Sequence, residues 1–594
     1  MKRLSLITII ILLPVIICAY TYTVKQDGTG DFTTIYDAFT CYDVQQNGGI
    51  IYVFPGVYEN VPLFQVTPNS VNIQIIGTNK TTCIIDADYA FYGFEIYNVN
   101  SNLTIKNFTV QDASIAGFRI NSGSYGNTII ENNNITNCGF QANASVQKSA
   151  LICHGNALIK GNTFIDNYNN WDYWAHEEFS LGGAIYIDYH DASVTDGLIE
   201  ITNNDFIGNF ARDCGAIFAT SNQVISISGN YFEGNGLLES TINNNVPQYC
   251  VIARFEDCNI VDFNSNICYN NESYEVQMGP SHEQQGLVFK DCTVAQIRNN
   301  TINQNLDLSA TEGIKGIMIN ATNDEGAYNI INNIVFYNWD GINCMNDDYG
   351  SLNIDYNDIH NNPPAGGNNN YVNVTQGEHD ILYYPDLDPL TFQPIWNSST
   401  KSRCIDAGVP NLFDDDNTPS DIGAVCAIKH RIDVVDLPSP SVDNGLKWLS
   451  FPSLDDVYST SSYDPDKAGD LLFDILFPFE DPELEYVKHE NNYFVRQWQG
   501  NWQGTSNIFS KTNGYIFQMN EAATLEISGF KVSDNTHIKL DGNSYENWIG
   551  YWLEETQTLS DAFGDEWNTG NIYSIQHQDW SAYYSEGTWK YKTS

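Results

Sequence analysis

The middle of the chain repeats one short phrase about every thirty residues. The phrase is an apolar run, one or two polar residues, an Asn, a spacer, an apolar residue and often a second Asn, as in ALIKGNTFIDN. The anchoring residues are Asn133, Asn162, Asn204, Asn230, Asn266, Asn300, Asn333 and Asn357, with Asn107 as an earlier member. This period predicts a solenoid, because each unit can bury its apolar face only against its neighbours.

The Asn anchors have a structural explanation of their own. Each of them follows an apolar, β-branched run at a point where the chain must turn. Asn tolerates left-handed backbone angles, and its amide can bond to the Asn on the next coil. We therefore expect a ladder of stacked Asn residues inside a turn, and no ligand role for them.

The composition is strongly acidic. In 594 residues, 26 Lys and Arg stand against 73 Asp and Glu, which gives a net charge of −47. Such a surface repels nucleic acid and anionic lipid, so we expect neither as a partner. A polyanionic polysaccharide would need a bridging cation, and Ca²⁺ is the ion that dense loop carboxylates suit.

The first nineteen residues have the pattern of a secretory signal peptide. Lys2 and Arg3 precede an apolar run from Leu4 to Cys18, and Ala19 offers a cleavage site after residue 19. No later stretch is apolar and long enough to span a bilayer. We expect the mature chain outside the cell, secreted or on the extracellular surface, and its oligomeric state stays open.

Export permits disulfides, and one pair of Cys residues has suggestive spacing. Cys258 and Cys292 each lie eight residues before an anchor Asn. They should stack on adjacent coils about 4.8 Å apart, which is within disulfide reach. A disulfide and a ladder of buried thiols are both compatible with this spacing. No Cys or His spacing is that of a zinc site.

The segment after the signal peptide carries a family resemblance. It reads DGTGDFTTIYDAF, with Thr33 and Thr34 capping a short amphipathic helix, and is followed by Gly56, Tyr58 and Glu59. The segment resembles the N-terminal part of pectinesterase-type proteins of the pectin-lyase-like superfamily. The resemblance extends over about residues 20–430 and implies an all-β, right-handed parallel β-helix with a helix capping its first coil.

The superfamily's catalytic motifs are absent from this chain. It contains no QDTL, no DFIFG with a nucleophilic Asp, no LGRPW and no polygalacturonase signature. The resemblance therefore implies the fold but not the chemistry. If the protein is an enzyme, we expect a polysaccharide lyase or a glycoside hydrolase, not a pectinesterase.

A second resemblance ends the solenoid. Cys404-Ile-Asp-Ala-Gly408, an Asp-rich loop and Asp421-Ile-Gly-Ala424 resemble the last coil of many exported bacterial β-helix proteins. The loop residues Asp414, Asp415 and Asp416 would hold calcium, or else form a rigid turn with exposed acids. Cys404 and Cys426 could pair across this coil. The β-helix is expected over 20–432.

The chain changes character after the solenoid. Residues 433–445 have the Pro and Ser content of a linker. Residues 446–594 are rich in Trp and Tyr, and contain two half-similar repeats, of which the second is incomplete. We expect a small β-rich domain there. Its Trp residues belong either in its core or on a sugar-stacking surface.

The phase of the repeat locates the long insertions. They cover 168–182, 236–250, 272–285 and 306–315, each at the same point of its coil, so they should wall one side of a groove. The first insertion combines sugar-stacking rings with acid or base groups. These candidates are the rings of Trp171, Tyr173 and Trp174, and the titratable groups of His176 and Glu177. A self-packed loop explains the same residues.

The strands that follow the insertions carry a second set of candidates. Asp188, Thr220, Glu256 and Asp291 each lie five residues beyond the start of their strand. Arg254, two residues from Glu256, should share its face. Stacked carboxylates must share protons or a cation, so the set predicts an acid/base or Ca²⁺ site, or else a solvated ladder.

Two functions fit these observations. The first is a secreted or cell-surface protein that binds, and in its enzymatic form cleaves, a polysaccharide or cell-envelope glycan in the groove. The second is a non-catalytic adhesin or structural surface protein. The fold alone does not separate them.

Overall fold

The computed structural model describes residues 20–594, apart from the following segments. The residues not described are 1–19, 60, 67–70, 99–100, 123–125, 141–146, 170–180, 190–196, 238–247, 272–282, 304–313, 361, 363–368, 396–401, 415–418, 427–429, 442–444, 451–456, 459–483, 490–491, 497–501, 505–507, 510–512, 531–546, 548–557, 559–571, 573, 577–579, 586–587 and 594. The signal peptide therefore lies outside the described residues. No described helix is long and apolar enough to cross a membrane.

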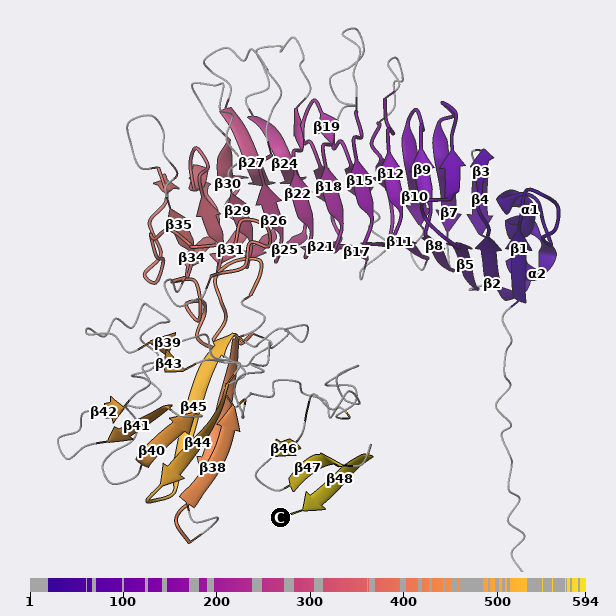
Figure 1. The fold of residues 1–594 in the computed structure, drawn as a ribbon. Helices are drawn as coiled ribbons and strands as arrows, with labels where there is room; N and C mark the ends of the chain where they lie inside the picture. The colour runs from indigo at the N-terminus through magenta and orange to yellow at the C-terminus, as the bar shows by residue number, and fades with distance from the viewer. Residues whose placement is uncertain are drawn as a thin grey trace, which may run out of the picture. The chain divides into compact units, whose positions relative to one another are not determined.

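Three long parallel sheets form a right-handed parallel β-helix, which confirms the predicted fold class (Figure 1). The three sheets are named A, B and C, and their strands are given below. Along the chain, each coil contributes one strand to sheet C, then one to sheet A and one to sheet B, and neighbouring strands within a sheet run parallel. Sheet A has twelve strands and sheets B and C have eleven each. Because the neighbour of each strand is the equivalent strand one coil away, local repeats build a continuous core.

The strands of sheet A, in order, are β1 (Tyr20–Val24), β2 (Gly49–Val53), β5 (Asn72–Gly77), β8 (Asn102–Lys106), β11 (Asn127–Glu131), β14 (Ala157–Lys160), β17 (Leu198–Thr202), β21 (Val224–Ser228), β25 (Ile260–Asn264), β28 (Val294–Arg298), β31 (Ala327–Ile331) and β34 (Ser351–Asp355). Those of sheet B are β3 (Gly56–Glu59), β6 (Cys83–Asp86), β9 (Thr109–Gln111), β12 (Asn134–Thr136), β15 (Thr163–Ile165), β18 (Asp205–Ile207), β22 (Tyr231–Glu233), β26 (Ile267–Tyr269), β29 (Thr301–Asn303), β32 (Ile334–Phe336) and β35 (Asp358–His360). Those of sheet C are β4 (Val61–Val66), β7 (Tyr92–Asn98), β10 (Ala116–Ser122), β13 (Leu151–Cys153), β16 (Ile185–Tyr189), β20 (Ile217–Ser221), β24 (Gln248–Glu256), β27 (Glu283–Lys290), β30 (Lys315–Thr322), β33 (Ile342–Asp348) and β36 (Tyr371–Val372). A two-stranded pair, β19 (Phe210–Ala211) with β23 (Gly236–Leu237), lies between sheets B and C in the sequence.

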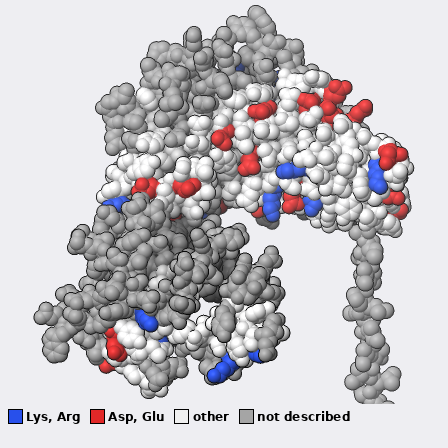
Figure 2. All heavy atoms as spheres, in the orientation of Figure 1, with Lys and Arg blue, Asp and Glu red and all other residues white. Residues whose placement is uncertain are grey.

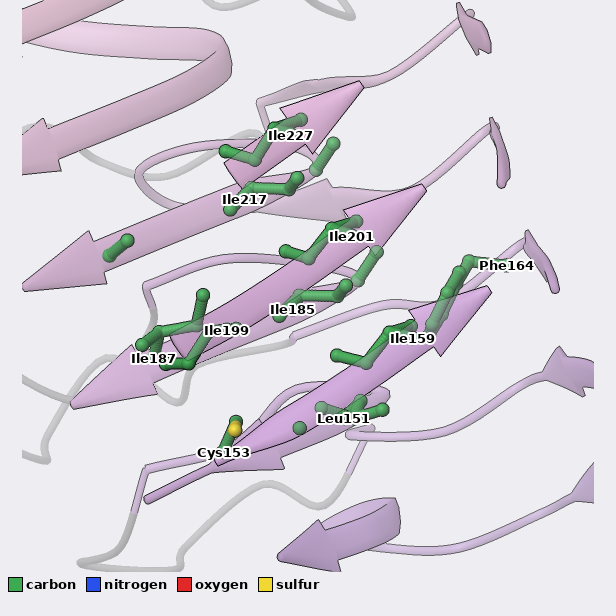
Figure 3. Close-up of a cluster of buried hydrophobic side chains, with 14 of the residues drawn as sticks. Leu151, Cys153, Ile159, Phe164, Ile185, Ile187, Ile199, Ile201, Ile217 and Ile227 are labelled. Carbon is green, nitrogen blue, oxygen red and sulfur yellow. The ribbon is translucent and has the colours of Figure 1, made fainter. Parts of the chain in front are cut away.

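The core fills the space between the three sheets. Figure 3 shows Ile185, Ile187 and Ile217 of sheet C beside the inward side chains of sheet A. In sheet B, the rings of successive coils stack, with centroids 5.0 Å apart for Phe164–Phe206 and 4.7 Å for Phe206–Phe232. Burying each such side chain contributes about 1.5–3 kcal/mol. The apolar half of the repeat therefore forms the core.

The predicted Asn ladder lies in the turn between sheets A and B. The backbone N–H and side-chain Nδ2 of each anchor donate to Oδ1 of the next, as from Asn162 to Asn204 at 2.9 and 3.0 Å. The ladder runs through Asn133, Asn162, Asn204, Asn230, Asn266, Asn300 and Asn333. The second Asn of the phrase forms a parallel ladder that includes Asn167, Asn209, Asn235 and Asn271.

Two details of the ladder prediction are wrong. The left-handed residue is the one before each anchor: Asn132, Asn203 and their equivalents have φ of 54 and 55°. Asn107 is itself left-handed, with φ of 66°, so it aligns with Asn132 and not with the anchors. Phe108 holds the ladder position there, and its N–H donates to Asn133 Oδ1 at 2.9 Å.

Two short helices cover the N-terminal coil, where a single capping helix was predicted. They are α1 (Ile35–Thr40) and α2 (Tyr42–Asn47). The side chain of Thr34 caps α1 by accepting a hydrogen bond from the N–H of Asp37. Ile35, Ala38 and Phe39 are buried in the same cluster as the solenoid core, because the open apolar end of a solenoid must be covered.

The chain forms two compact units. One comprises residues up to Asp355 with Ile359–Asp380, and the other comprises Tyr356–Asp358 with Ile381–Ser594. The second unit contains a two-stranded antiparallel pair, a five-stranded sheet, a further pair and a three-stranded sheet. Their strands are β37 (His430–Leu437) with β45 (Ala523–Phe530); β38 (Leu446–Ser450), β44 (Gly514–Met519), β40 (Leu484–His489), β41 (Asn492–Arg496) and β42 (Trp502–Gly504); β39 (Val457–Tyr458) with β43 (Ile508–Phe509); and β46 (Ser574–Gln576), β47 (Trp580–Ser585) and β48 (Thr588–Thr593). Residues 433–437, expected in a linker, lie in β37 instead.

Candidate functional site: the outer face of sheet C

The outer face of sheet C carries two columns of outward-pointing side chains, one residue per coil in each. The strand register places equivalent residues side by side, about 4.8 Å apart. The first column contains Glu95, Arg119, Ile152, Tyr186, Phe218, Arg254, Val288 and Met318. The second contains Tyr97, Asn121, His154, Asp188, Thr220, Glu256, Lys290 and Asn320. All four predicted insertions begin after a sheet B strand and precede or enter a sheet C strand, but their predicted bounds are too wide: residues 248–250, 283–285 and 315 belong to β24, β27 and β30, and 236–237 to β23.

His154 and Asp188 are neighbours in the second column. His154 Nδ1 lies 2.8 Å from the backbone carbonyl of Asp188. A carbonyl oxygen can only accept, so Nδ1 carries the proton of this hydrogen bond. The lone pair of the neutral ring is then on Nε2. His154 and Asp188 are both partly exposed, so a ligand on this face could meet the Nε2 lone pair of His154.

Aromatic rings occupy the middle of the first column. The rings of Tyr186 and Phe218 stack with centroids 5.8 Å apart, and His154 packs edge-on against Tyr186 at 6.3 Å. Burial, with a smaller effect of the Asp188 carboxylate, raises the pKa of Tyr186 to about 12. Its hydroxyl is therefore protonated at neutral pH and can donate a hydrogen bond. Phe218 is buried, at 6% exposure, whereas Tyr186 is partly exposed, so the Tyr186 ring is the one of the pair on which a sugar ring could stack.

A charged network joins both columns further along the sheet. Arg254 contacts Asp213 at 2.9 Å through Nη1 and Glu256 at 2.7 Å through Nη2. Lys290 binds the other oxygen of Glu256. Burial alone would lower the pKa of Arg254, but the two carboxylates raise it. The guanidinium therefore stays charged, and the prediction that Arg254 and Glu256 share a face is confirmed.

The expected carboxylate set is only partly brought together. Asp188 and Glu256 share the second column, with Thr220 on the strand between them. Asp291 lies outside the second column, because the residue opposite Glu256 on the neighbouring strand β27 is Lys290. A bulge in β24 places two residues opposite Gly286, so a count of five from that glycine overshoots by one. Asp291 instead accepts hydrogen bonds from the N–H and hydroxyl of Thr322 at 2.7 and 2.9 Å.

Several predicted site residues lie outside the described residues. They are Trp171, Tyr173, Trp174, His176 and Glu177 of the first insertion, and Asp415 and Asp416 of the Asp-rich loop. Asp414 is described, and its carboxylate accepts hydrogen bonds from the N–H of Asp421 at 2.8 Å and from the Cys426 thiol at 3.2 Å. Among the described residues, no group of three His, Cys, Asp or Glu side chains could hold a metal ion.

The candidate disulfides are absent, and all twelve described Cys residues are free thiols. Cys404 donates to the buried carboxylate of Asp358 at 3.3 Å, while Cys426 contacts Asp414, so the proposed pair has separate partners. Cys258 and Cys292 do stack on adjacent coils, as thiols. A hydrogen bond to Cys258, together with burial, raises the pKa of the Cys292 thiol well above its usual value.

Sequence reasoning missed four members of this surface: His154, Tyr186, Asp213 and Lys290. His154 follows the short strand β13 and has no motif around it. The sequence did offer one signal for Tyr186, because it lies two residues before Asp188 and so shares its face. Asp213 lies outside the strands, and nothing in its neighbourhood points to Arg254, which is 41 residues away.

No family profile matches this chain, and no curated protein matches it. Among solved structures, it is similar to the pectate lyase Pel9A, with a TM-score of 0.34 and 14% identity, over 68% of this chain and 96% of that one. It is also similar to a mutant pectin methylesterase in complex with a hexasaccharide, with a TM-score of 0.24 and 11% identity, over 45% and 93% of the two chains. At these TM-scores, neither likeness bears on the function of this chain.

Proposed function

We propose that the protein is an exported β-helix protein that binds polysaccharide along the outer face of sheet C. The observation that carries the proposal is the pair of in-register columns on this face. They place the Tyr186–Phe218 ring stack, His154 and Asp188 on consecutive coils of a rigid sheet. The partly exposed ring of Tyr186 and the row of hydrogen-bonding groups suit a linear polymer with repeated units.

The test is a glycan array probed with the wild-type protein and two variants. Tyr186→Ala removes an outward ring from sheet C, and Tyr52→Ala removes an outward ring from sheet A as a matched control. We expect wild-type binding to at least one glycan, a loss of about tenfold or more in Tyr186→Ala, and no change in Tyr52→Ala. Equal binding by Tyr186→Ala, or no glycan bound by the folded wild type, would contradict the proposal.

Cleavage of the bound glycan is a second candidate, favoured by one observation. The hydrogen bond from His154 Nδ1 to the Asp188 carbonyl leaves Nε2 as the atom that can take a proton, beside a carboxylate. Lyase and hydrolase chemistry both need such a group. Glu256 supports this less well, because Arg254 and Lys290 both bind its carboxylate.

Reducing-end and unsaturated-product assays on the bound glycans, with and without Ca²⁺, separate an enzyme from a binding protein. If the protein is an enzyme, His154→Gln should abolish product formation on every glycan that the variant still binds. Binding without any product in the wild type would instead identify a non-catalytic adhesin or structural surface protein.

A further inference from the structure

The strands of sheet C contain four basic residues, and each one lies against a carboxylate. Arg119 contacts Glu95 at 3.2 Å, and Lys315 contacts Asp340 at 3.4 Å. Arg254 and Lys290 belong to the network around Glu256. Two of these pairs are nearly inaccessible to solvent. The side chains of Arg254 and Asp213 are each 11% exposed, and those of Lys315 and Asp340 are 9% and 4% exposed.

This pairing removes the usual means of recognising an acidic sugar. An Arg binds a carboxylate strongly when both of its terminal nitrogens face the ligand. Both terminal nitrogens of Arg254 already contact protein carboxylates. Breaking a buried pair would also leave an uncompensated charge, which is strongly destabilising.

The balance of charge on this face points the same way. The four bases are offset by Glu95, Asp213, Glu256 and Asp340, and Asp188 is a fifth described carboxylate. The chain as a whole carries −47, and Figure 2 shows acidic side chains on the visible surface of the solenoid, gathered towards its N-terminal coils. An anionic polymer would be repelled both locally and at long range.

Neutral amides also lie in sheet C. Nδ2 of Asn121, Oε1 of Gln284 and both amide atoms of Gln285 are buried with no hydrogen-bond partner. Asn121 is in the second column beside His154 and is partly exposed, whereas Gln284 and Gln285, the second and third residues of β27, are exposed by only 5% and 0%. Asn121 is therefore the amide that a sugar hydroxyl can approach, whereas the fully buried Gln285 cannot contact a ligand. An amide donates to one hydroxyl and accepts from the next.

We propose that the ligand of the sheet C face is an uncharged polysaccharide, recognised through its hydroxyl groups and ring faces, and that uronate and sulfated glycans are rejected. The proposal rests on the proposed function and specifies its substrate class. The proposal also predicts a gain of binding. If one basic residue loses its carboxylate partner, the affinity of this face for an acidic sugar should increase.

The experiment compares neutral and uronate oligosaccharides of equal length by calorimetry in low salt with EDTA. Glu95→Gln removes the carboxylate partner of Arg119, which is partly exposed at 31% and keeps its hydrogen bond to the Tyr92 hydroxyl. Glu131→Gln is the matched control, because it makes the same change of charge on sheet A, beside Lys106 at 3.7 Å. We expect the wild type to bind only the neutral ligand, and Glu95→Gln to gain about threefold to fivefold in affinity for the uronate.

The outcomes separate the two proposals. Wild-type binding of the uronate that is as tight as neutral binding and is lost in Tyr186→Ala would overturn the inference and leave the proposed function standing. An equal gain in Glu95→Gln and Glu131→Gln would also overturn it, because net charge alone would then explain the effect. Binding of neither ligand, or binding unaffected by Tyr186→Ala, would overturn the proposed function itself.

Discussion

At the scale of the residue, the ladder Asn is the most constrained position in the chain. Asn204 is fully buried, yet its side chain bonds at both ends. Its Oδ1 accepts from Asn162, and its Nδ2 donates to Asn230 Oδ1 at 3.0 Å and to the Ile159 carbonyl at 2.8 Å. An amide is the neutral side-chain group that can donate two hydrogen bonds while its oxygen accepts others.

Replacing Asn204 with Leu should therefore destabilise the protein, although the two side chains are similar in size. The change leaves the buried Asn162 amide and the Ile159 carbonyl without their partners. We expect the free energy of unfolding to fall by about 2–5 kcal/mol, measured by urea denaturation. Asn203→Gly is the control, because Asn203 is exposed and left-handed, and it should change stability by only about 0.5 kcal/mol. Similar losses in both variants would refute the ladder's role.

His379 offers a second residue-scale prediction, through pH. Its hydrogen bond to Asp355 raises its pKa above the ordinary value of 6.5, with Nδ1 3.0 Å from Oδ2. A raised pKa means that the pair stabilises the fold below the ordinary His pKa and that this contribution is lost as pH rises through the raised value. NMR titration should show a lower pKa for His379 in Asp355→Asn. An unchanged titration would show that the pair does not form in solution.

At the scale of the element, stacking of equivalent strands makes neighbours of residues far apart in the sequence. Cys258 and Cys292 illustrate this, because the period alone places them on adjacent coils. Both are buried, and the hydrogen bond to Cys258, together with burial, raises the pKa of Cys292 and so disfavours the thiolate that a disulfide reaction would need from it. The period of the sequence repeat predicts that the two Cys residues are close together, but it does not predict whether they are thiols or a disulfide.

We expect these two thiols to remain reduced in the native protein. Alkylation in the folded state should leave both unmodified, and alkylation after unfolding in guanidinium should modify both, as read by peptide mass spectrometry. Cys41, which is partly exposed, serves as the internal control for reagent access. A peptide pair linked through Cys258 and Cys292 would contradict the thiol form.

The site shows where counting along an element fails. Asp188, Glu256 and Arg254 were found from the phase of the repeat, since residues two apart on a strand share a face. Asp291 was misplaced by one position because the bulge in β24 is not visible in the sequence. His154 and Asp213 were missed because their partners come from other coils.

At the scale of the whole molecule, the net charge of −47 should weaken the folded state by self-repulsion. Salt screens such repulsion, because the Debye length falls from about 30 Å at 0.01 M to about 8 Å at 0.15 M. We expect the thermal midpoint, followed by far-UV circular dichroism, to rise over this range of NaCl. Sucrose of equal osmolarity is the control for effects unrelated to charge. A midpoint that falls with salt would show that ion pairs, and not repulsion, dominate.

The sequence by itself determined the solenoid, its core, its cap and the side on which the insertions lie. These follow from a local repeat, because each coil contacts only its neighbours and so the same pattern gives the same structure every time. Only the tertiary structure decided which side chains meet on the outer face of sheet C. Which side chains meet there depends on the register between coils, on the bulge in β24 and on the pairing of the four basic residues of sheet C with carboxylates. None of these is a property of a single repeat.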